Sequence, residues 1–370
     1  MKAEVLLVTS IYPPQVGGPA IFTSRFKDWL VEHGISARVI SYGLGDKNDD
    51  EIIDFVSLKQ NRLKAFIKYI YLVKKNSDKS TMILSNGAFL ETYLACLLTR
   101  RKYVTKIPGD QVWEFSVNRG WTSSSIEKFQ DERLNLIQRI LRTFLNLAYK
   151  NSKLVIVPSQ QLSNLTEKWG VAKSKIKLIY NCVDPNKFQN LQINKKDYDL
   201  ITVCRLVPWK GLEELVSCAI ELNLRLAIVG DGPLLDDLRI LSQKFQSNVK
   251  FLGSTNNEEV QGILNSSRIF VLNSSYEATS YALIEAKMCG LPVIAKKSDG
   301  STTLIQDSID GFVVEPNTDK NLKSCINKLI INEEIISNFG LEARKDALRR
   351  FNQEISFPKI LHVMRKTIEA

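Results

Sequence analysis

Histidine is nearly absent from this chain of 370 residues, and its six cysteines lie far apart in the sequence. Zinc sites use closely spaced cysteine and histidine ligands, so no metal site of this kind is expected. Scattered cysteines favour a reducing compartment, and we predict a cytoplasmic protein. The chain also lacks a run of about 18 apolar residues, so no membrane-spanning helix is expected. The opening segment, MKAEVLLVTSIYPPQVGG, has no small-residue cleavage site and predicts a first β-strand instead of a signal peptide.

Acidic residues are scarce in the first half of the chain. Residues 1–187 contain 28 Lys and Arg against 17 Asp and Glu, whereas the remaining residues contain 22 against 23. A basic excess confined to one half predicts an anionic partner for that half, either a membrane surface or an acidic substrate. Nucleic acid is not expected, because no recognition motif accompanies the charge.

The densest basic segment is Leu58–Lys79, where seven cations are interspersed with aliphatic and aromatic residues. A basic amphipathic helix of this kind is able to lie on anionic lipid. The alternative is a helix that packs on a sheet and turns a solvated basic face to water, and the two can hold together. The first alternative predicts peripheral association with the inner face of the plasma membrane.

Short β-branched runs alternate with amphipathic helical stretches along almost the whole chain. The expected strands lie in EVLLVTS, TMILSN, KLVIVPS and KIKLIYN in the first half, and in DLITVCRL, LRLAIVG, NVKFLG and RIFVLNS in the second. Helices are expected at 126–149 and 234–245. This alternation predicts an α/β fold with parallel sheets that are covered on both faces.

A polar stretch around Pro185 interrupts this pattern and predicts a domain boundary. We expect two doubly wound, Rossmann-like domains with a cleft between them, at residues 1–184 and 185–351. Residues 352–370 are expected to form a helix that packs back on the first domain. In open α/β sheets, ligands bind at the carboxyl ends of the strands, so functional residues should follow strands.

Two features of the second domain provide positive charge after strands. Arg205 and Lys210 follow DLITVC, and Gly211 opens the next helix. Two fixed cations beside a helix start suit a diphosphate, although solvated surface cations are the alternative. Further along, Thr279 or Ser280 is expected to cap a helix, and the backbone N–H groups of its first turn would attract an anion.

A pair of carboxylates surrounds that second helix start. Glu277 and Glu285 are separated by seven residues, and Glu285 lies among apolar neighbours. A buried glutamate is tolerable when it accepts hydrogen bonds from a ligand, such as the two hydroxyls of a ribose. Glu277 would then face a hydroxylated ligand at the helix start. The alternative for Glu285 is an ion pair with Lys287 or Lys296.

In their order along the chain, these segments resemble the retaining family-4 glycosyltransferases of the GT-B fold. The similarity covers essentially the whole chain and rests on CRLVPWKG at 204–211, EATSYALIE at 277–285, GDGP at 230–233, FLG at 251–253, VPS at 157–159 and NCVD at 181–184. The family usually has glycine where this chain has Cys182 and Ala278, which affects loop shape more than chemistry. A dinucleotide fingerprint is poorly supported, because Leu235 replaces the third glycine after VGDG.

The resemblance implies a role for each of these residues. Arg205 and Lys210 would neutralise a departing diphosphate. Glu285 would hold the ribose, and Glu277 would bind hydroxyls of the transferred sugar. The remaining donor contacts would come from backbone near the helix start and from the strand end that shapes the donor pocket, namely Ser280, Tyr281, Ala282, Leu283 and Gly253.

In the first domain, Gly17 and Gly18 join the first strand to a helix and allow close backbone approach. The resemblance implies that this pair contacts the donor phosphate, whereas the alternative is a flexible turn. The family often has a histidine after a middle strand of this domain, and this chain has none there. The corresponding segment, YVTKIPGDQVWEF, offers Asp110 as the residue that meets the acceptor hydroxyl, or alternatively as a local backbone cap.

The sequence therefore predicts a metal-independent, retaining glycosyltransferase of the hexosyltransferase type, with no cofactor beyond its nucleotide-diphosphate sugar. The expected acceptor is a hydroxyl of a glycan or of a lipid-linked glycan, in the synthesis of a cell-surface polysaccharide or glycoconjugate. Two alternatives stay open. One is another GT-B enzyme, such as a sugar-nucleotide epimerase or a phosphorylase, and the other is a non-catalytic nucleotide-sugar-binding protein.

Overall fold

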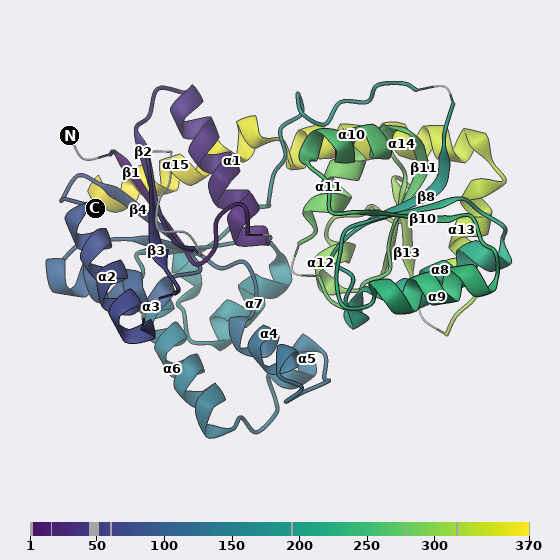
Figure 1. The fold of residues 1–370 in the computed structure, drawn as a ribbon. Coiled ribbons are helices and arrows are strands. Elements are labelled where there is room, and N and C mark those ends of the chain that lie inside the picture. The colour runs from purple at the N-terminus through teal and green to yellow at the C-terminus, as the bar shows by residue number, and fades with distance from the viewer. Residues whose placement is uncertain are drawn as a thin grey trace. The chain divides into compact units, whose positions relative to one another are not determined.

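The computed structural model describes residues 3–15, 17–43, 52–59, 61–193, 195–277, 279–315 and 317–369. The chain divides into two compact units, one made of Met1–Ile179 with Phe357–Ala370 and the other of Tyr180–Ser356 (Figure 1). The sequence predicts boundaries at 184/185 and 351/352, about five residues from these positions. Ala278, which differs from the family pattern, lies outside the described residues.

The first unit is built on a seven-stranded sheet in the order β3-β2-β1-β4-β5-β6-β7, and its recorded pairings are parallel. The strands are β1 (Val5–Thr9), β2 (Ala37–Gly43), β3 (Ile53–Ser57), β4 (Met82–Asn86), β5 (Val104–Lys106), β6 (Leu154–Val157) and β7 (Ile176–Leu178). The helices between them are α1 (Gly18–Glu32), α2 (Arg62–Lys75), α3 (Phe89–Thr99), α4 (Gln111–Asn118), α5 (Ile126–Phe129), α6 (Leu136–Asn151) and α7 (Gln160–Lys168).

The second unit is built on a six-stranded parallel sheet in the order β10-β9-β8-β11-β12-β13. Its strands are β8 (Tyr198–Val203), β9 (Leu226–Val229), β10 (Val249–Gly253), β11 (Ser267–Leu272), β12 (Val293–Lys296) and β13 (Gly311–Val314). Its helices are α8 (Leu212–Glu221), α9 (Leu235–Lys244), α10 (Asn257–Asn265), α11 (Tyr281–Met288), α12 (Asp299–Thr302), α13 (Leu322–Ile330) and α14 (Glu333–Arg350). Helices α8 and α9 lie on one face of this sheet and α10 on the other (Figure 1).

The inner strands, such as β1 and β9, have the continuous burial of a sheet that is covered on both faces. All five residues of β1 and all four of β9 are buried, and both strands consist almost entirely of aliphatic residues. Parallel strands require this, because crossover helices cover both faces and leave no solvated side. The predicted α/β class and the eight predicted strands are confirmed.

One predicted helix is wrong. The periodicity of 126–149 suggests a continuous helix, but the structure has a short α5, an interruption at 130–135, and then α6. Asn135 explains the restart, because it forms a capping box with Gln138 at the beginning of α6. Apolar residues recur at helical spacing both before and after 130–135, so hydrophobic periodicity alone does not reveal the interruption.

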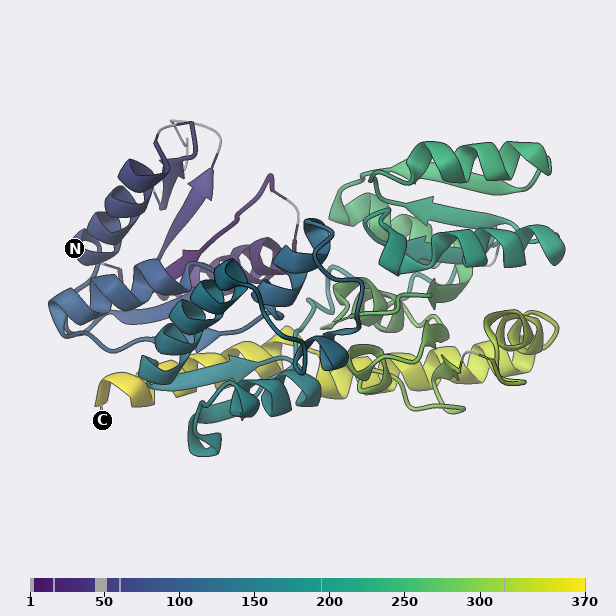
Figure 2. The same ribbon diagram turned by 90° about the horizontal axis from the view of Figure 1, so that it is seen from below.

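The last helix, α15 (Gln353–Glu369), returns most of its length to the first unit. Phe357 is 1% exposed and packs against the aromatic rings of Phe22, Phe26 and Trp29 of α1. Both ends of the chain therefore belong to the same unit, as Figure 2 also shows. Among the described residues, no helix is both long and apolar enough to cross a membrane.

Candidate active site

The polar residues of the second unit gather where the winding of its sheet reverses. From β8 the chain proceeds through α8 to β9 and then β10 on one side, whereas β11, β12 and β13 follow on the other. The loops after β8 and β11 leave neighbouring strands at the same sheet edge. Such a switch point opens a crevice at the carboxyl ends of the strands, which is the usual ligand site of this architecture.

Lys210 and Glu277 meet at this edge, although they are 67 residues apart in sequence. Lys210 ends a short 3-10 turn after β8, and its ammonium donates to Glu277 Oε1. Ser274 Oγ donates to the same carboxylate oxygen at 2.9 Å. Burial lowers the pKa of Lys210, but the charge of Glu277 outweighs it and holds the pKa above its ordinary value. Lys210 is therefore a fixed cation in the physiological range.

Asn273 joins the two loops that carry this pair, and sequence reasoning did not identify it. Its amide Nδ2 donates to the carbonyl oxygen of Gly211 at 2.8 Å and to Glu214 Oε2 at 2.9 Å. Gly211 has φ of +61°, and a Cβ there would lie 2.4 Å from the Asn273 carbonyl oxygen. Only glycine permits this approach. The available signal was an asparagine directly after a buried strand, beside a serine that contacts Glu277.

A third loop, at 230–233, packs against the backbone that carries Arg205. Gly230 has φ of +131°, and a Cβ there would lie 1.9 Å from the carbonyl oxygen of Cys204. The Gly230 amide donates to the Gly253 carbonyl at 2.7 Å, and the Leu206 amide donates to the Asp231 carbonyl at 2.9 Å. Through these contacts the GDGP segment packs under the loop that carries Arg205, and the end of β10 lies at the same sheet edge.

Arg205 is exposed at the exit of β8, five residues before Lys210. It forms no ion pair with any residue in the described ranges. Its guanidinium is thus able to bind an incoming anion without first breaking a contact within the protein. Lys210, by contrast, is already paired with Glu277.

Helix α11 begins beside Glu277, and Ser280 is its N-cap. The Ser280 side chain accepts from the Leu283 amide at 3.3 Å, so this amide is directed to the cap. Glu285 lies in the second turn of α11 and is 6% exposed. The lysines proposed as its alternative partners bind other acids: Lys287 binds Asp310 and Asp346, and Lys296 lies 3.5 Å from Glu214.

In the first unit, the glycine pair stands at the start of α1. A Cβ at Gly17 would lie 2.7 Å from Ile11 Cδ1, whereas one at Gly18 would meet no atom within 4 Å. Asn86, at the end of β4, holds this helix start: its Nδ2 donates to the Pro19 carbonyl and to Thr23 Oγ1, each at 3.2 Å. Gly18 is exposed and the backbone around it is therefore accessible to a ligand.

Asp110 has the contacts of a structural cap. Its Oδ1 accepts from the Val112 and Trp113 amides at the start of α4, and its Oδ2 accepts from Arg142 Nη2 at 2.7 Å and from Gln130 at 3.0 Å. The side chain is fully buried. These contacts correspond to the alternative that the sequence left open and do not support a meeting with an acceptor hydroxyl.

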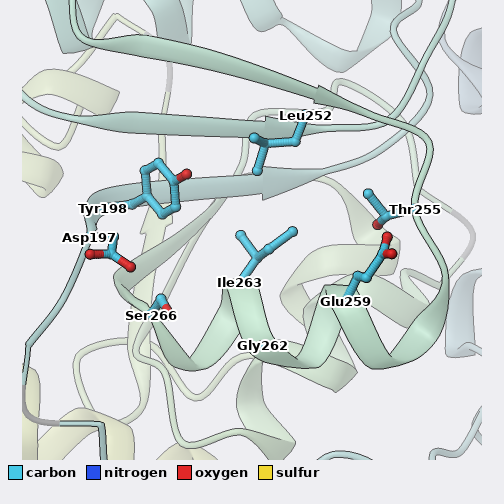
Figure 3. Close-up of a pocket in the computed structure, with 8 residues that line it drawn as sticks. All are labelled: Asp197, Tyr198, Leu252, Thr255, Glu259, Gly262, Ile263 and Ser266. Carbon is cyan, nitrogen blue, oxygen red and sulfur yellow. The ribbon is translucent and has the colours of Figure 1, made fainter.

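The second unit also has cavities elsewhere. One of about 410 Å³ lies between α10 and the sheet, where Ile263 points toward Leu252 and Tyr198 (Figure 3). Its charged lining residues are Asp197 and Glu259, and it contains no lysine or arginine. In the described part of the chain, no group of three or more His, Cys, Asp or Glu side chains has the arrangement of a metal site.

Comparison with known proteins divides the chain in the same way. Residues 183–346 match the family model described as glycosyl transferases group 1, and residues 16–187 match glycosyltransferase family 4. An uncharacterized glycosyltransferase of Methanocaldococcus jannaschii is 24% identical over 98% of this chain and 97% of its own length. The UDP-Gal:alpha-D-GlcNAc-diphosphoundecaprenol alpha-1,3-galactosyltransferase of Escherichia coli is 27% identical over 62% of this chain and 63% of its own.

A solved structure shares the fold over almost the whole chain. HepE of Anabaena, crystallised in complex with UDP and glucose, superposes with a TM-score of 0.77 at 19% identity. The superposition covers 98% of this chain and 100% of that one. At this identity the similarity establishes the architecture, while the chemistry has to be argued from the residues above.

Proposed function

Because this chain belongs to the family-4 glycosyltransferases of the GT-B fold, we propose that it transfers a sugar from a nucleotide-diphosphate donor with retention of anomeric configuration. The observation that carries the proposal is the convergence of Lys210 and Glu277 at the switch point of the second sheet, with Arg205 exposed five residues earlier in the loop after β8. Two cations suit the leaving diphosphate, and a carboxylate suits sugar hydroxyls.

In this proposal the ion pair is exchanged when the donor binds. Lys210 and Arg205 turn to the diphosphate oxygens, and Glu277 accepts hydrogen bonds from hydroxyls of the sugar. The bond from the anomeric carbon to the diphosphate then breaks, and its electron pair leaves with the diphosphate. The acceptor oxygen bonds to the anomeric carbon on the same face, and its proton passes to the departing diphosphate. Charge that is fixed in advance stabilises this transition state most effectively.

Other residues fix the donor on either side of the reacting bond. Glu285, buried in α11, binds the ribose hydroxyls, and Gly253 at the end of β10 borders the donor base. The positive end of α11, at Ser280, Tyr281 and Ala282, faces the sugar and phosphates. Gly17 and Gly18, of which Gly18 is exposed, would contact the donor phosphate through their backbone. Arg205 and Lys210 take the charge-neutralising role that a metal ion has in other transferases, so we propose a metal-independent reaction.

The proposed acceptor is a hydroxyl of a glycan, carried on a lipid. Two relatives support this class: the E. coli galactosyltransferase named above, and an N-acetylgalactosaminyltransferase of Campylobacter jejuni that is named for a diphospho-undecaprenol substrate. A basic first half agrees with a substrate that carries a diphosphate. We therefore propose a role in the synthesis of a cell-surface glycan or glycoconjugate.

The donor site is tested by calorimetric titration of UDP-, GDP-, ADP- and TDP-sugars into the full chain. One of them should bind, and Glu285→Ala should weaken it by about tenfold to a hundredfold, since hydrogen bonds to a charged group contribute roughly 1.5–3 kcal/mol. Glu259→Ala, which removes an exposed carboxylate from α10, is the matched control and should leave the affinity unchanged. Unchanged affinity in Glu285→Ala would contradict the ribose role.

The transfer itself is tested by incubating the protein with donor in the presence and absence of undecaprenyl-diphosphate glycans. Transfer to the lipid with an α-linked product from an α-linked donor supports the proposal. Conversion of the sugar without acceptor would instead identify an epimerase. Donor binding without any turnover would identify a nucleotide-sugar-binding protein.

A further inference from the structure

Exposed apolar side chains are concentrated on three helices of the first unit. The described residues include twenty large apolar side chains that are exposed, and ten of them belong to α2, α3 and α6. They are between 40% and 72% exposed, and we call them the three-helix face: Leu63, Ile67, Tyr71, Leu97, Leu98, Leu136, Ile137, Ile140, Phe144 and Leu147. A contiguous exposed apolar surface on a folded protein indicates an interaction site.

The three helices that carry these ten side chains are neighbours in the first unit. Arg101, after α3, donates to the Lys74 carbonyl of α2 at 3.0 Å. Phe89 of α3 packs edge-on against Tyr149 of α6, with ring centroids 5.1 Å apart. Figure 1 shows α2, α3 and α6 in succession along the first unit. Their inward residues, such as Tyr69 of α2, are buried in the core.

Each outer stripe follows helical periodicity. On α2 the exposed residues are spaced by four, at 63, 67 and 71, and on α6 they occur at 136/137, 140, 144 and 147. The inward residues of α6, including Leu145 and Ala148, occupy the neighbouring side. Both helices are therefore apolar toward the core and again toward the outside, which a helix with only a structural role does not need.

The exposed charge on the three helices themselves is basic. Neither α2 nor α6 contains an acidic residue, and the one acid of α3, Glu91, is bound by the Tyr42 hydroxyl at 2.8 Å. The exposed cations on or directly after the three helices are Arg62, Lys64, Lys68, Lys74, Lys75, Arg100, Arg139 and Lys150. Apolar side chains bordered by lysine and arginine stems match a boundary where hydrocarbon meets anionic headgroups.

From these observations, we propose that the three-helix face docks the protein on an anionic lipid bilayer, with α6 inserting its apolar stripe and α2 supplying most of the headgroup contacts. A second copy of this chain is a poorer occupant, because two such faces would bring like charges together without carboxylates to pair them. The inference rests on the proposed function in one respect only: a protein docked on the bilayer would encounter its lipid-linked acceptor there. Docking itself requires neither donor nor acceptor.

The test is co-sedimentation of the full chain with vesicles of phosphatidylcholine, alone or with phosphatidylglycerol at about 30% of the lipid. The wild type should bind the anionic vesicles and leave them as salt screens the headgroup charge. The variant Ile137→Ser/Ile140→Ser/Phe144→Ser should reduce the vesicle partition coefficient at least tenfold. The matched control, Ile240→Ser/Phe245→Ser/Ile331→Ser, removes apolar side chains of the second unit that are at least as exposed, and it should bind as the wild type does.

A second variant separates charge from insertion. Lys64→Gln/Lys68→Gln/Lys75→Gln should reduce vesicle binding at least tenfold at low salt. At high salt the difference between this variant and the wild type should be small, because salt weakens wild-type binding as well. Circular dichroism and calorimetric donor titration test whether each variant keeps its fold and its donor site. A failure of the proposed transferase activity is therefore distinguishable from a failure of docking.

Three outcomes would overturn the proposal. The first is equal binding of the wild type to neutral and anionic vesicles, or to neither. The second is unchanged binding of the α6 variant. The third is a dimer in sedimentation velocity that the α6 variant abolishes while no vesicle binding is seen, which would assign the face to a second copy.

Discussion

At the scale of the residue, the ion pair of Lys210 and Glu277 is the feature that sequence patterns could locate only in part. Both residues follow strands, and strand order in a parallel sheet places such exits at one edge. Spacing shows that both belong to this edge but not that they touch. Contact depends on the close backbone approach of Gly211 to Asn273, which no periodicity reveals.

Removal of Lys210 should affect turnover more than donor binding. In Lys210→Ala we expect kcat to fall about a hundredfold, or roughly 2.7 kcal/mol, because charge on the leaving diphosphate is greatest in the transition state. The donor Kd should change less than tenfold, since Arg205 remains. Steady-state kinetics and calorimetry give the two quantities.

The matched control for this experiment is Lys250→Ala, which removes an exposed lysine of β10 in the same unit. It should leave both quantities unchanged. Equal losses in kcat and in donor affinity for Lys210→Ala would show that the lysine contributes only to ground-state binding.

For Asp110, the local sequence pattern fits two different roles and does not decide between them. A strand exit that ends in Gly-Asp suits both a catalytic carboxylate and a helix cap, and the pattern is the same for the two. The difference lies in Arg142 and Gln130, which come from later elements and bind its second oxygen. Those contacts are long-range, so the local pattern could not choose between the alternatives.

At the scale of the element, helix α11 is fixed by a buried charge cluster around Lys287. Lys287 is fully buried and donates to the Leu304 carbonyl at 2.6 Å, to Asp310 at 2.9 Å and to Asp346 at 2.5 Å. Arg350 binds Asp346 from one turn further along α14. Because Lys287 of α11 and Arg350 of α14 both bind Asp346, α11 is anchored to α14.

The anchoring of α11 should depend on Asp346. In Asp346→Asn we expect α11 and α14 to be less stable by about 3 kcal/mol, because loss of one partner leaves buried charges without compensation. Hydrogen–deuterium exchange of α11 peptides should then be about a hundredfold faster. Asp236→Asn, at an exposed carboxylate of α9, should change nothing. Unaltered exchange in α11 would contradict the anchoring role.

The pH dependence of this effect has a defined sign. Burial raises the pKa of Asp346, but hydrogen bonding from Arg350 and the charge of Lys287 outweigh it and hold the pKa at about 2, below the ordinary 3.8. A carboxyl whose pKa is lower in the folded than in the unfolded state stabilises the fold at any pH above its unfolded-state pKa. This stabilisation is lost as the pH falls toward the folded-state pKa. The difference between Asp346→Asn and the wild type should therefore be full above about pH 5 and shrink between pH 4 and 2.

At the scale of the whole molecule, the class of the fold follows from alternation of strands and helices, which needs no tertiary information. The sequence also predicts a terminal helix after the second domain, and α15 is present at 353–369. What the sequence does not supply is the aromatic cluster that receives it. Phe22, Phe26 and Trp29 lie on α1, more than three hundred residues earlier, and their spacing also suits an ordinary core face.

Truncation of Phe357 should destabilise the first unit. The ring is buried among three aromatic side chains, and Phe357→Ala should lower the free energy of unfolding by about 3–5 kcal/mol, as large-to-small substitutions in a core do. The unfolding transition of this unit is followed by tryptophan fluorescence, because four of the five tryptophans belong to it. One of them is Trp29, whose ring lies 5.7 Å from that of Phe357. Phe245→Ala, at an exposed ring of the second unit, is the control, and an equal effect of both variants would contradict the prediction.

The path of α15 also bears on how the protein is made. Translation delivers the seven strands of the first sheet well before residue 357 leaves the ribosome, so for most of synthesis the aromatic residues of α1 lack their contact with Phe357. The nascent first unit must wait, with Phe22, Phe26 and Trp29 open to chaperones or to misassociation, until the entire second unit has emerged.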